Sequence, residues 1–423
     1  MKFTRTILPN GLRLITVPLK DSQAVTVLVM VEAGSKYETK EQNGISHFLE
    51  HICFKGTKNR PRAIDISREL DSMGAQYNAF TTQEFTGYFA KSAPKHFEKI
   101  LEIIADLYLN PVLVKEEIEK EKGVIIEEIN MYEDLPQKNV QDVFMELLYR
   151  DQPAGWNIAG TKENVRSFTA EDILKYRDMN YVSGATAVVI AGNFDEKHAV
   201  HAVTRYFSDM SSGEKHIKTK VVEDQKKPEF AIKEKATDQM HFVLGARSFD
   251  VYDPRNPAAR ILSAVLGGGM SSRLFEKMRN ELGICYYIGA SNETFTDHGF
   301  FSVAAGVDNS RFHEALKAVM KELSSLKHTL VSSEEIRKTK DFLIGNLTLS
   351  LETSDAVAEH FGFQEIMRKK IKMPSEVIKE VESQKAENIM KIAKEIFRDN
   401  RLNLAAVGSK KNSADIGDFL RFS

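Results

Sequence analysis

The order of apolar and polar positions predicts three strands and then a helix at the start of the chain. Apolar runs at about 2–8, 12–18 and 24–31 are typical of strands, and Pro-Asn-Gly between the first two is a turn sequence. Within 44–57 the apolar residues recur with helical spacing instead. The segment "AIDISRELDSMG" predicts a second helix that ends at Gly74, because glycine is a common C-terminal cap.

The rest of the first half continues this mixture of strands and helices. "AQYNAF" and "FTGYFAKS" predict two strands joined by a short turn. Helices dominate from about 94 to 180, and "ATAVVIAGNF" at 185–194 predicts another strand before a further helix. The first half is therefore predicted to have an α+β fold.

The second half repeats this order of elements. It is predicted to contain strands near 229–247, helices near 256–281, paired strands near 283–291 and 298–306, several more helices, and a late strand at 402–408. "RELDSMGAQYNA" in the first half resembles "KMRNELGICYYIGA" in the second, and each has a tyrosine third after the glycine (Tyr77 and Tyr286). This repetition indicates two duplicated α+β halves of roughly 200 residues, a common domain size.

A lysine- and glutamate-rich segment separates the two halves. Residues 211–229 show no apolar periodicity, which is typical of an interdomain linker. We therefore predict domains at 1–210 and 230–423. Only the first of them contains a His-x-x-Glu-His sequence, so only one half can hold such a metal site.

Composition narrows the possible partners and location. The 423 residues are 42% apolar and 28% charged with a formal net charge of −2, so neither nucleic acid nor an anionic membrane is expected as the main partner. The most apolar early run, "AVTVLVMV", is too short to span a bilayer, and the N-terminus lacks the apolar stretch of a signal peptide. The distant Cys53 and Cys285 exclude a disulfide framework, and a cytoplasmic location is expected.

Residues 47–51, His-Phe-Leu-Glu-His, form a candidate metal site. On a helix, His47, Glu50 and His51 share one face. The apolar residues of this stretch gather on roughly the opposite side, which is the spacing of a core stripe: Ile45, Phe48, Leu49 and Ile52. Two neutral imidazoles one turn apart can bind one Zn²⁺, and a glutamate beside them can polarise a water held by the metal. The simpler alternative is that these residues form a solvated polar face. Two ligands do not make a metal site, so a third ligand is needed to decide between the two interpretations.

A third ligand is available on a predicted helix at 114–135. Its buried face is predicted to carry Val114, Ile118, Ile125, Ile129 and Tyr132. Glu121 and Glu128 fall on the same face, Glu127 projects well away from it, and Glu117 lies near it and stays a candidate. A carboxylate on an apolar face needs a partner, which can be a metal cation or, alternatively, a lysine or arginine.

These motifs resemble those of the pitrilysin/insulinase family of zinc metallopeptidases, which includes insulin-degrading enzyme and the mitochondrial processing peptidases. His47, Glu50 and His51 match the family's inverted motif, and Glu128 within "EKGVIIEEINM" matches its partner glutamate. The resemblance covers nearly the whole chain. It implies an α+β fold of two homologous domains, each a mostly antiparallel sheet covered by helices.

The resemblance also implies the roles of the residues around the metal. One Zn²⁺ per chain would be held by His47, His51 and Glu128. Glu50 would be the general base on a zinc-bound water, and Glu121 would be a second carboxylate that supports the site. Nitrogen and carboxylate ligands suit zinc, although manganese or cobalt can occupy the same site.

Further residues are implied to hold the substrate. Arg279 and Tyr286 match an arginine and a tyrosine that the family contributes from its second domain, where they hold the substrate backbone and help stabilise the reaction intermediate. Taken alone, they are an ordinary helical arginine and strand tyrosine. The adjacent Tyr287 points to the opposite face of the strand, so an error in register would exchange the two tyrosines.

The segment "AQYNAFTTQEFTGYF" matches the family's substrate-binding edge strand. An extended peptide adds to such an edge through backbone hydrogen bonds, so unfolded segments and short peptides are the expected substrates. The implied contacts are Asn78, Ala79, Phe80 and Thr81. Phe54, three residues after His51, can line a pocket for the residue after the cut or pack in the core.

We therefore predict a zinc-dependent metalloendopeptidase that hydrolyses extended peptides or unfolded segments. Larger family members carry four such domains in one chain and enclose their substrate, so this chain is expected to form a homodimer or a heterodimer with an inactive homologue. The competing hypotheses are a non-catalytic scaffold and a processing-peptidase-like subunit that needs a partner. A scaffold has no physical need for a complete hydrolytic site, so the intact motif favours the enzyme.

Overall fold

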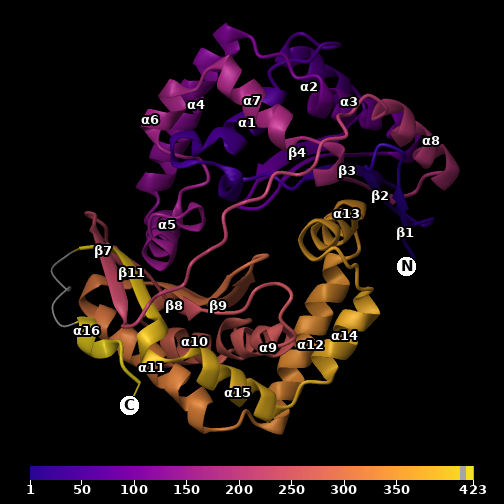
Figure 1. The fold of residues 1–423 in the computed structure, drawn as a ribbon. Helices are drawn as coiled ribbons and strands as arrows, with labels where there is room; N and C mark the ends of the chain where they lie inside the picture. Colours follow the sequence, from indigo (N-terminus) through magenta and orange to yellow (C-terminus); the bar gives the residue numbers. More distant parts are fainter. Residues whose placement is uncertain (410–415, 423) are drawn as a thin grey trace. The chain divides into compact units, whose positions relative to one another are not determined.

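The computed structural model describes residues 1–409 and 416–422, which form two compact units (Figure 1). Unit 1 comprises Met1–Ile129, Asn157–Thr219 and Leu349–Ile371, and unit 2 comprises Asn130–Trp156, Lys220–Thr348 and Lys372–Ser423. Each unit therefore contains a segment from the other half of the chain. Each combines a mostly antiparallel sheet with helices, which confirms the predicted α+β class.

The sheet of unit 1 has six strands in the order β1-β2-β6-β3-β5-β4. Their bounds are β1 Thr4–Ile7, β2 Arg13–Pro18, β3 Val25–Val31, β4 Gln76–Thr81, β5 Thr86–Ser92 and β6 Thr186–Gly192. β2 and β6 pair in parallel and the other neighbours are antiparallel. β3 and β6 are buried throughout, whereas β4 ends the sheet and has no described strand on its outer edge.

Helices cover both faces of this sheet (Figure 1). The helices of unit 1 are α1 Ile45–Cys53, α2 Ala63–Ser72, α3 Phe97–Leu109, α4 Lys115–Asp134 (which continues into unit 2), α6 Lys162–Ser167, α7 Ala170–Asn180, α8 Glu196–Tyr206 and α13 Ser354–Phe363. Alternate residues of β3 such as Val27 and Val29 point into the core shared with α1 and α3. α13 packs on the opposite face, where a Cβ at Gly362 would collide with the Met30 sulfur, so glycine permits the close approach.

The sheet of unit 2 has five strands in the order β7-β11-β8-β10-β9. Their bounds are β7 Glu229–Glu234, β8 Gln239–Arg247, β9 Cys285–Thr294, β10 Gly299–Asp308 and β11 Leu402–Gly408. The helices of unit 2 are α5 Pro136–Tyr149, α9 Asn256–Gly267, α10 Arg273–Phe275, α11 Phe312–His328, α12 Ser333–Ser350 (which ends at the boundary with unit 1), α14 Pro374–Glu382, α15 Ala386–Ile396 and α16 Ile416–Phe419. Only β7 and β11 pair in parallel.

Unit 2 repeats the layering of unit 1. Phe242 and Leu244 of β8 point into a core formed with α9, α11 and α15. Val243, between them, points to the other face, where it packs with Val140 and Phe144 of α5. In both units, a helix from the other half of the chain thus covers the second face of the sheet.

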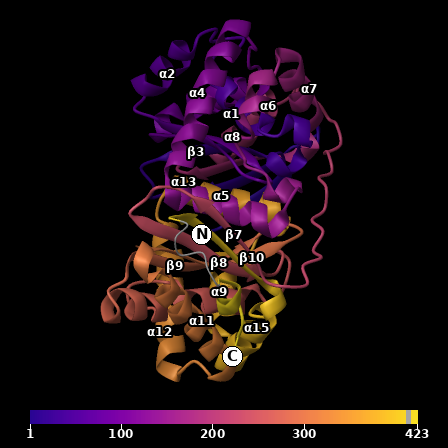
Figure 2. The ribbon, with the colours of Figure 1, turned by 90° about the vertical axis from the view of Figure 1, so that its left-hand side faces the viewer.

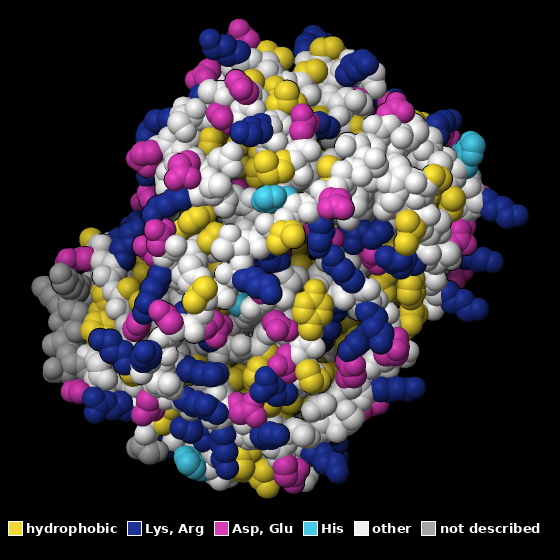
Figure 3. Space-filling model, viewed as in Figure 1, with side chains coloured by type: hydrophobic (Ala, Val, Ile, Leu, Met, Phe, Trp, Pro, Cys, Tyr) yellow, Lys and Arg dark blue, Asp and Glu magenta, His cyan; other side chains and the backbone are white. Residues whose placement is uncertain are grey.

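Residues 211–228 contain no helix or strand and join α8 to β7, as the extended trace in Figure 2 shows. No helix within the described residues is long and apolar enough to cross a lipid bilayer. The face seen in Figure 3 carries acidic and basic side chains together, with lysine and arginine most frequent over α11 and α15. This mixture agrees with the near-zero net charge of the sequence.

Candidate metal site

α1 presents its two histidines and Glu50 away from the core, as its periodicity predicts. Four apolar side chains of the helix are fully buried in the core of unit 1: Ile45, Phe48, Leu49 and Ile52. His47, Glu50 and His51 lie on the other side and are only partly buried. Cys53 is also fully buried, with its Sγ 3.7 Å from the hydroxyl oxygen of Tyr88, so it packs in the core.

The N-terminus of α1 is held by a buried carboxylate. Glu38 accepts hydrogen bonds from the backbone N–H groups of Gly44 and Ser46, each at 2.8 Å. These are among the helix N–H groups that have no partner within the helix. Gly44 has a φ of 103° and lies against the backbone of Gly160, where a side chain has no room. The start of the helix is therefore fixed in position and direction.

α4 provides the third candidate ligand. Ile118, Ile125 and Ile129 are buried as predicted, and Glu127 is exposed. The prediction for Val114 was wrong: the helix begins at Lys115, so Val114 lies outside its periodicity and is exposed. The phase of the helix directs Glu121 and Glu128 toward α1.

His47, His51 and Glu128 converge as one group of possible metal ligands. The Oε2 atom of Glu128 lies 3.7 Å from Nε2 of His47 and 3.5 Å from Nε2 of His51. The ligand atoms of all three residues lie within 4.8 Å of one another. Ligands at about 2.1 Å from a tetrahedral zinc ion are separated by about 3.4 Å, so this arrangement fits one zinc ion.

The protonation of His47 also suits a ligand. Burial, with a smaller contribution from His51, lowers the pKa of His47 to about 3. The imidazole is therefore neutral near pH 7 and has a free lone pair for a metal. Its buried Nδ1 atom has no hydrogen-bond partner within the described part of the chain.

Glu121 orients the second histidine. Its Oε1 atom lies 2.8 Å from Nδ1 of His51, and its Oε2 atom lies 2.6 Å from Nζ of Lys55. Burial alone would raise the pKa of Glu121, but these two contacts outweigh burial and lower it. For His51 the effect of burial has the opposite sign, because burial by itself lowers the pKa of an imidazole. The hydrogen bond with Glu121 and the charges of the nearby carboxylates outweigh burial, so the pKa of His51 is raised overall.

Glu50 lies beside the ligands and has one hydroxyl partner. Thr81 Oγ1, at the end of β4, donates a hydrogen bond to Glu50 Oε2 at 2.7 Å. Burial raises the pKa of Glu50, and the Thr81 hydrogen bond partly opposes this shift. A carboxylate with a raised pKa next to a candidate metal site is suited to accept a proton.

The edge strand β4 runs up to this site. Asn78 is exposed, and its Oδ1 atom accepts the backbone N–H of Ala79. Phe80 is half-buried, with its ring centroid 6.1 Å from that of Phe85. Phe54 is half-buried, and its ring centroid lies 6.5 Å from those of both Tyr77 and Tyr88, so the ring packs against the core whatever else it contacts.

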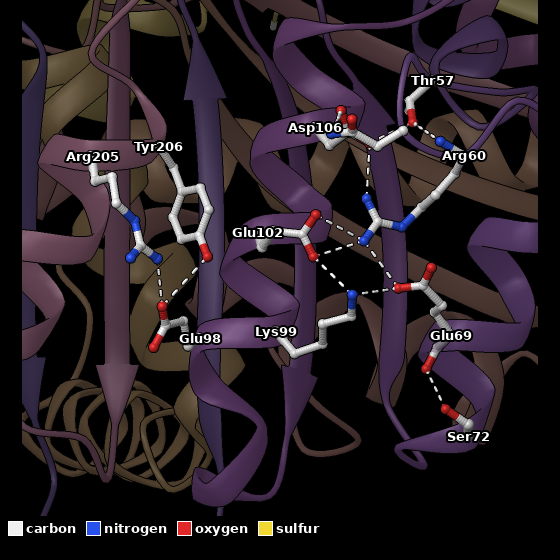
Figure 4. A network of polar contacts seen from close by, with 11 residues as sticks. Thr57, Arg60, Glu69, Ser72, Glu98, Lys99, Glu102, Asp106, Arg205 and Tyr206 are labelled. Carbon is white, nitrogen blue, oxygen red and sulfur yellow. Dashed lines mark hydrogen bonds and ion pairs between the residues drawn. The ribbon is translucent and has the colours of Figure 1, made fainter.

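A network of charges anchors the loop that follows α1 (Figure 4). The buried guanidinium of Arg60 lies 2.8 Å from Asp106, 2.7 Å from Glu102 and 2.9 Å from Glu69. The Thr57 hydroxyl also donates a hydrogen bond to Asp106. The loop is thereby tied to both α2 and α3, which anchors the C-terminal end of α1.

Arg279 and Tyr286 belong to unit 2 and lie against each other. The guanidinium carbon of Arg279 is 4.8 Å from the centre of the Tyr286 ring, and Arg279 donates a hydrogen bond to the Tyr286 carbonyl. The Tyr286 side chain is 75% exposed. Tyr287 points the other way, and its hydroxyl lies 2.9 Å from Nδ1 of His241.

Some supporting residues were not predicted from the sequence. Lys55 follows His51 by four residues, a spacing that on a helix places both side chains on the same side. This spacing could have suggested that both contact one carboxylate on α4, as they do with Glu121. Arg60 acts through contacts with the distant α3, and Glu38 binds the start of α1 six and eight residues further along the chain, and no sequence pattern marks either residue. The hydrogen bond from Thr81 to Glu50 was not foreseen either, since Thr81 was predicted only as a substrate contact.

Comparisons with known proteins assign the chain to a family. Residues 14–162, which contain all the candidate metal ligands, match the family described as Insulinase (Peptidase family M16), and residues 167–343 match Peptidase M16 inactive domain. An uncharacterized zinc protease of Bacillus subtilis, YmxG, is 32% identical over 395 residues, which are 92% of this chain and 95% of its own. An uncharacterized zinc protease of Rickettsia felis is 32% identical over 398 residues, which are 93% of this chain and 95% of that protein. The chain belongs to the M16 insulinase family of peptidases.

Solved structures show the same fold. A protease from Helicobacter pylori superimposes with a TM-score of 0.89 at 22% identity, covering 96% of this chain and 99% of that one. A Pseudomonas fluorescens structure described as a peptidase M16 inactive domain gives a TM-score of 0.90 at 14% identity. The superposition covers 97% of this chain and 99% of that one. At these identities the likeness establishes the architecture, and activity has to be argued from the residues of the site.

Proposed function

We propose that the protein is a zinc-dependent endopeptidase for extended peptides and unfolded segments. The observation that carries this proposal is the convergence of His47, His51 and Glu128 on one point, with Glu50 beside them. The relatives named zinc proteases match over almost the entire chain, which supports the same function.

Each residue of the site would have a defined task. His47, His51 and Glu128 would hold the Zn²⁺, and Glu121 would keep the ring proton of His51 on Nδ1 so that Nε2 stays free. When bound, the zinc ion polarises water and the scissile carbonyl. Glu50 would take the proton from the attacking water and deliver it to the leaving amine, a role for which its raised pKa is suited.

The substrate would bind as an added strand. β4 has an outer edge that no described strand occupies, and it ends at Thr81, which contacts Glu50. A peptide extended along this edge would therefore reach the catalytic base. Arg279 and Tyr286 would hold the substrate backbone from unit 2, with the exposed Tyr286 ring kept in place by the guanidinium.

A non-catalytic scaffold is the competing function. One solved structure with this fold is described as a peptidase M16 inactive domain, so we argue activity from the residues of the site and not from the fold. The paired ligands, the buried Glu121 and the raised pKa of Glu50 favour the enzyme. Peptide cleavage by the wild type but not by Glu50→Gln tests the proposal.

We also propose that the active form is a homodimer located in the cytoplasm. Larger family members use four such domains to enclose their substrate, whereas this chain has two units, so we expect a second copy to supply the others. Light scattering of the purified protein is expected to give twice the chain mass of 47.8 kDa. A monomer mass at concentrations where the enzyme is active would contradict the dimer and leave the peptidase proposal intact.

A further inference from the structure

A cluster of four cations and two carboxylates lies in unit 1 apart from the metal site. Glu32, just after β3, lies 3.0 Å from Arg13, 2.8 Å from Lys215 and 3.2 Å from Lys369. The second carboxylate, Glu365, accepts two hydrogen bonds from Arg5 at 2.9 and 3.0 Å and lies 3.5 Å from the other guanidinium nitrogen of Arg13. None of these residues takes part in the candidate metal site.

The charges of this cluster do not cancel. Within the described part of the chain, Glu32 and Glu365 are the only acidic side chains that pair with the four cations. Two positive charges are thus in excess, and they lie outside the buried part of the cluster, since the buried Glu32, Arg13 and Glu365 sum to one negative charge. Like charges held close together repel one another, so the arrangement favours an additional anion.

The excess charge is concentrated on two lysines. The ammonium groups of Lys215 and Lys369 both contact the same oxygen, Oε2 of Glu32, so they are close neighbours. Burial and the nearby Lys215 lower the pKa of Lys369. Both side chains are still 40% and 45% exposed, which leaves them open to a ligand from solvent.

The backbone at Lys369 turns at the end of the short helical segment Gln364–Arg368. Lys369 has a φ of 54° and a ψ of 13°, in the left-handed region. Among the described non-glycine residues only Arg150 shares a positive φ. A left-handed residue commonly ends a helix, and it costs about 1 kcal/mol for a residue with a Cβ, so glycine is expected to fit at this position.

We propose that Lys215 and Lys369 bind a phosphate group in unit 1, on the sheet face covered by α13. A phosphate group carries close to two negative charges at pH 7, which matches the excess of two positive charges better than a carboxylate does. Lysine ammonium groups bind phosphate oxygens as point charges. The bound phosphate would tie the linker, through Lys215, to the segment that follows α13.

Isothermal titration calorimetry of the zinc-loaded protein with sodium phosphate tests this proposal. The expected result is saturable binding of one phosphate at this cluster per chain, at ionic strength held constant with sodium chloride. Lys215→Met and Lys369→Met should each weaken binding at least tenfold. Lys220→Met and Lys370→Met, exposed lysines close in sequence to the cluster, should leave it unchanged.

A second variant separates loss of binding from loss of folding. Lys369→Gly removes the ammonium group but favours the left-handed backbone, so it should fold and still bind phosphate at least tenfold more weakly. Titration with O-phosphoserine distinguishes free phosphate from the phosphate of a larger molecule. Tighter binding of the monoester, lost in the same variants, would assign the site to the larger molecule, and weaker binding would assign it to free phosphate.

Two results would overturn the proposal. The first is the absence of phosphate binding to the wild type beyond the effect of chloride. The second is phosphate binding that survives in all three cluster variants, because this would place the anion elsewhere, for instance on the zinc ion.

Discussion

Nδ1 of His51 lies 2.8 Å from Oε1 of Glu121, a carboxylate that is only 2% exposed. A neutral imidazole has one ring proton, and this contact holds that proton on Nδ1. The lone pair of Nε2 is then free on the side where His47 and Glu128 lie. Metal binding is thus expected to depend on a residue that does not itself hold the metal.

The first prediction concerns this supporting carboxylate. Glu121→Gln should weaken zinc binding by about 10- to 100-fold, since the charge that orients His51 is lost. Competition with a chromogenic chelator measures the dissociation constant. Glu119→Gln, on the exposed side of the same helix, is the matched control. Equal zinc affinity in the two variants would show that Glu121 does not support the site.

The second prediction tests the phase of α4. Glu128→Ala should lose bound zinc after dialysis, because one of three protein ligands is removed. Glu127→Ala changes the neighbouring exposed glutamate and should retain zinc at the wild-type ratio. Metal content measured by inductively coupled plasma mass spectrometry distinguishes them. Zinc loss from the Glu127 variant alone would contradict the proposed ligand set.

The third prediction concerns pH. A general base acts only when deprotonated, so activity should fall as the pH falls through the raised pKa of Glu50. The hydrogen bond from Thr81 lowers that pKa. Thr81→Val should therefore move the acid limb of kcat/KM to higher pH. The pH profile on a fluorogenic peptide measures this shift, and an acid limb that stays in place or moves down would exclude the pairing.

The fourth prediction concerns stability. Arg60→Met leaves the buried Asp106 without its guanidinium partner and weakens the attachment to Glu102, so unit 1 should lose about 3 kcal/mol of stability. Urea unfolding followed by circular dichroism measures the loss. Arg62→Met removes an exposed arginine of the same loop and should change stability little. Equal stability of the two variants would mean that the network does not anchor the loop.

Local patterns predicted most of the fold, and they left Glu117, Glu121 and Glu128 as candidates for the third ligand, of which the family resemblance selected Glu128. The burial of Ile45, Phe48, Leu49 and Ile52 followed from helical spacing, which also turned the two histidines outward. The same reasoning placed Glu128 and Glu127 on different sides of α4. It failed at Val114, because periodicity does not reveal which residue begins a helix.

Long-range contacts could not be predicted in the same way. The contacts of Arg60 with Glu102 and Asp106 of α3, which are 42 and 46 residues away in the chain, depend on how separate segments pack. The crossing of α5 and α13 into the units of the opposite halves has the same origin. The apolar residues of α5 and α13 have the spacing of any amphipathic helix. Such a pattern shows which face of a helix is buried, but it does not show which sheet the helix covers.

Peptide mapping by mass spectrometry tests the peptidase most directly. The zinc-loaded wild type and Glu50→Gln, matched in zinc content, would each be incubated with a complex mixture of unstructured peptides. Glutamine keeps the size of the side chain and the Thr81 contact but cannot accept the proton. We expect many cuts by the wild type and none of them by the variant. Equal cutting by both, or no cutting by a zinc-loaded wild type, would contradict an endopeptidase that uses Glu50 as its base.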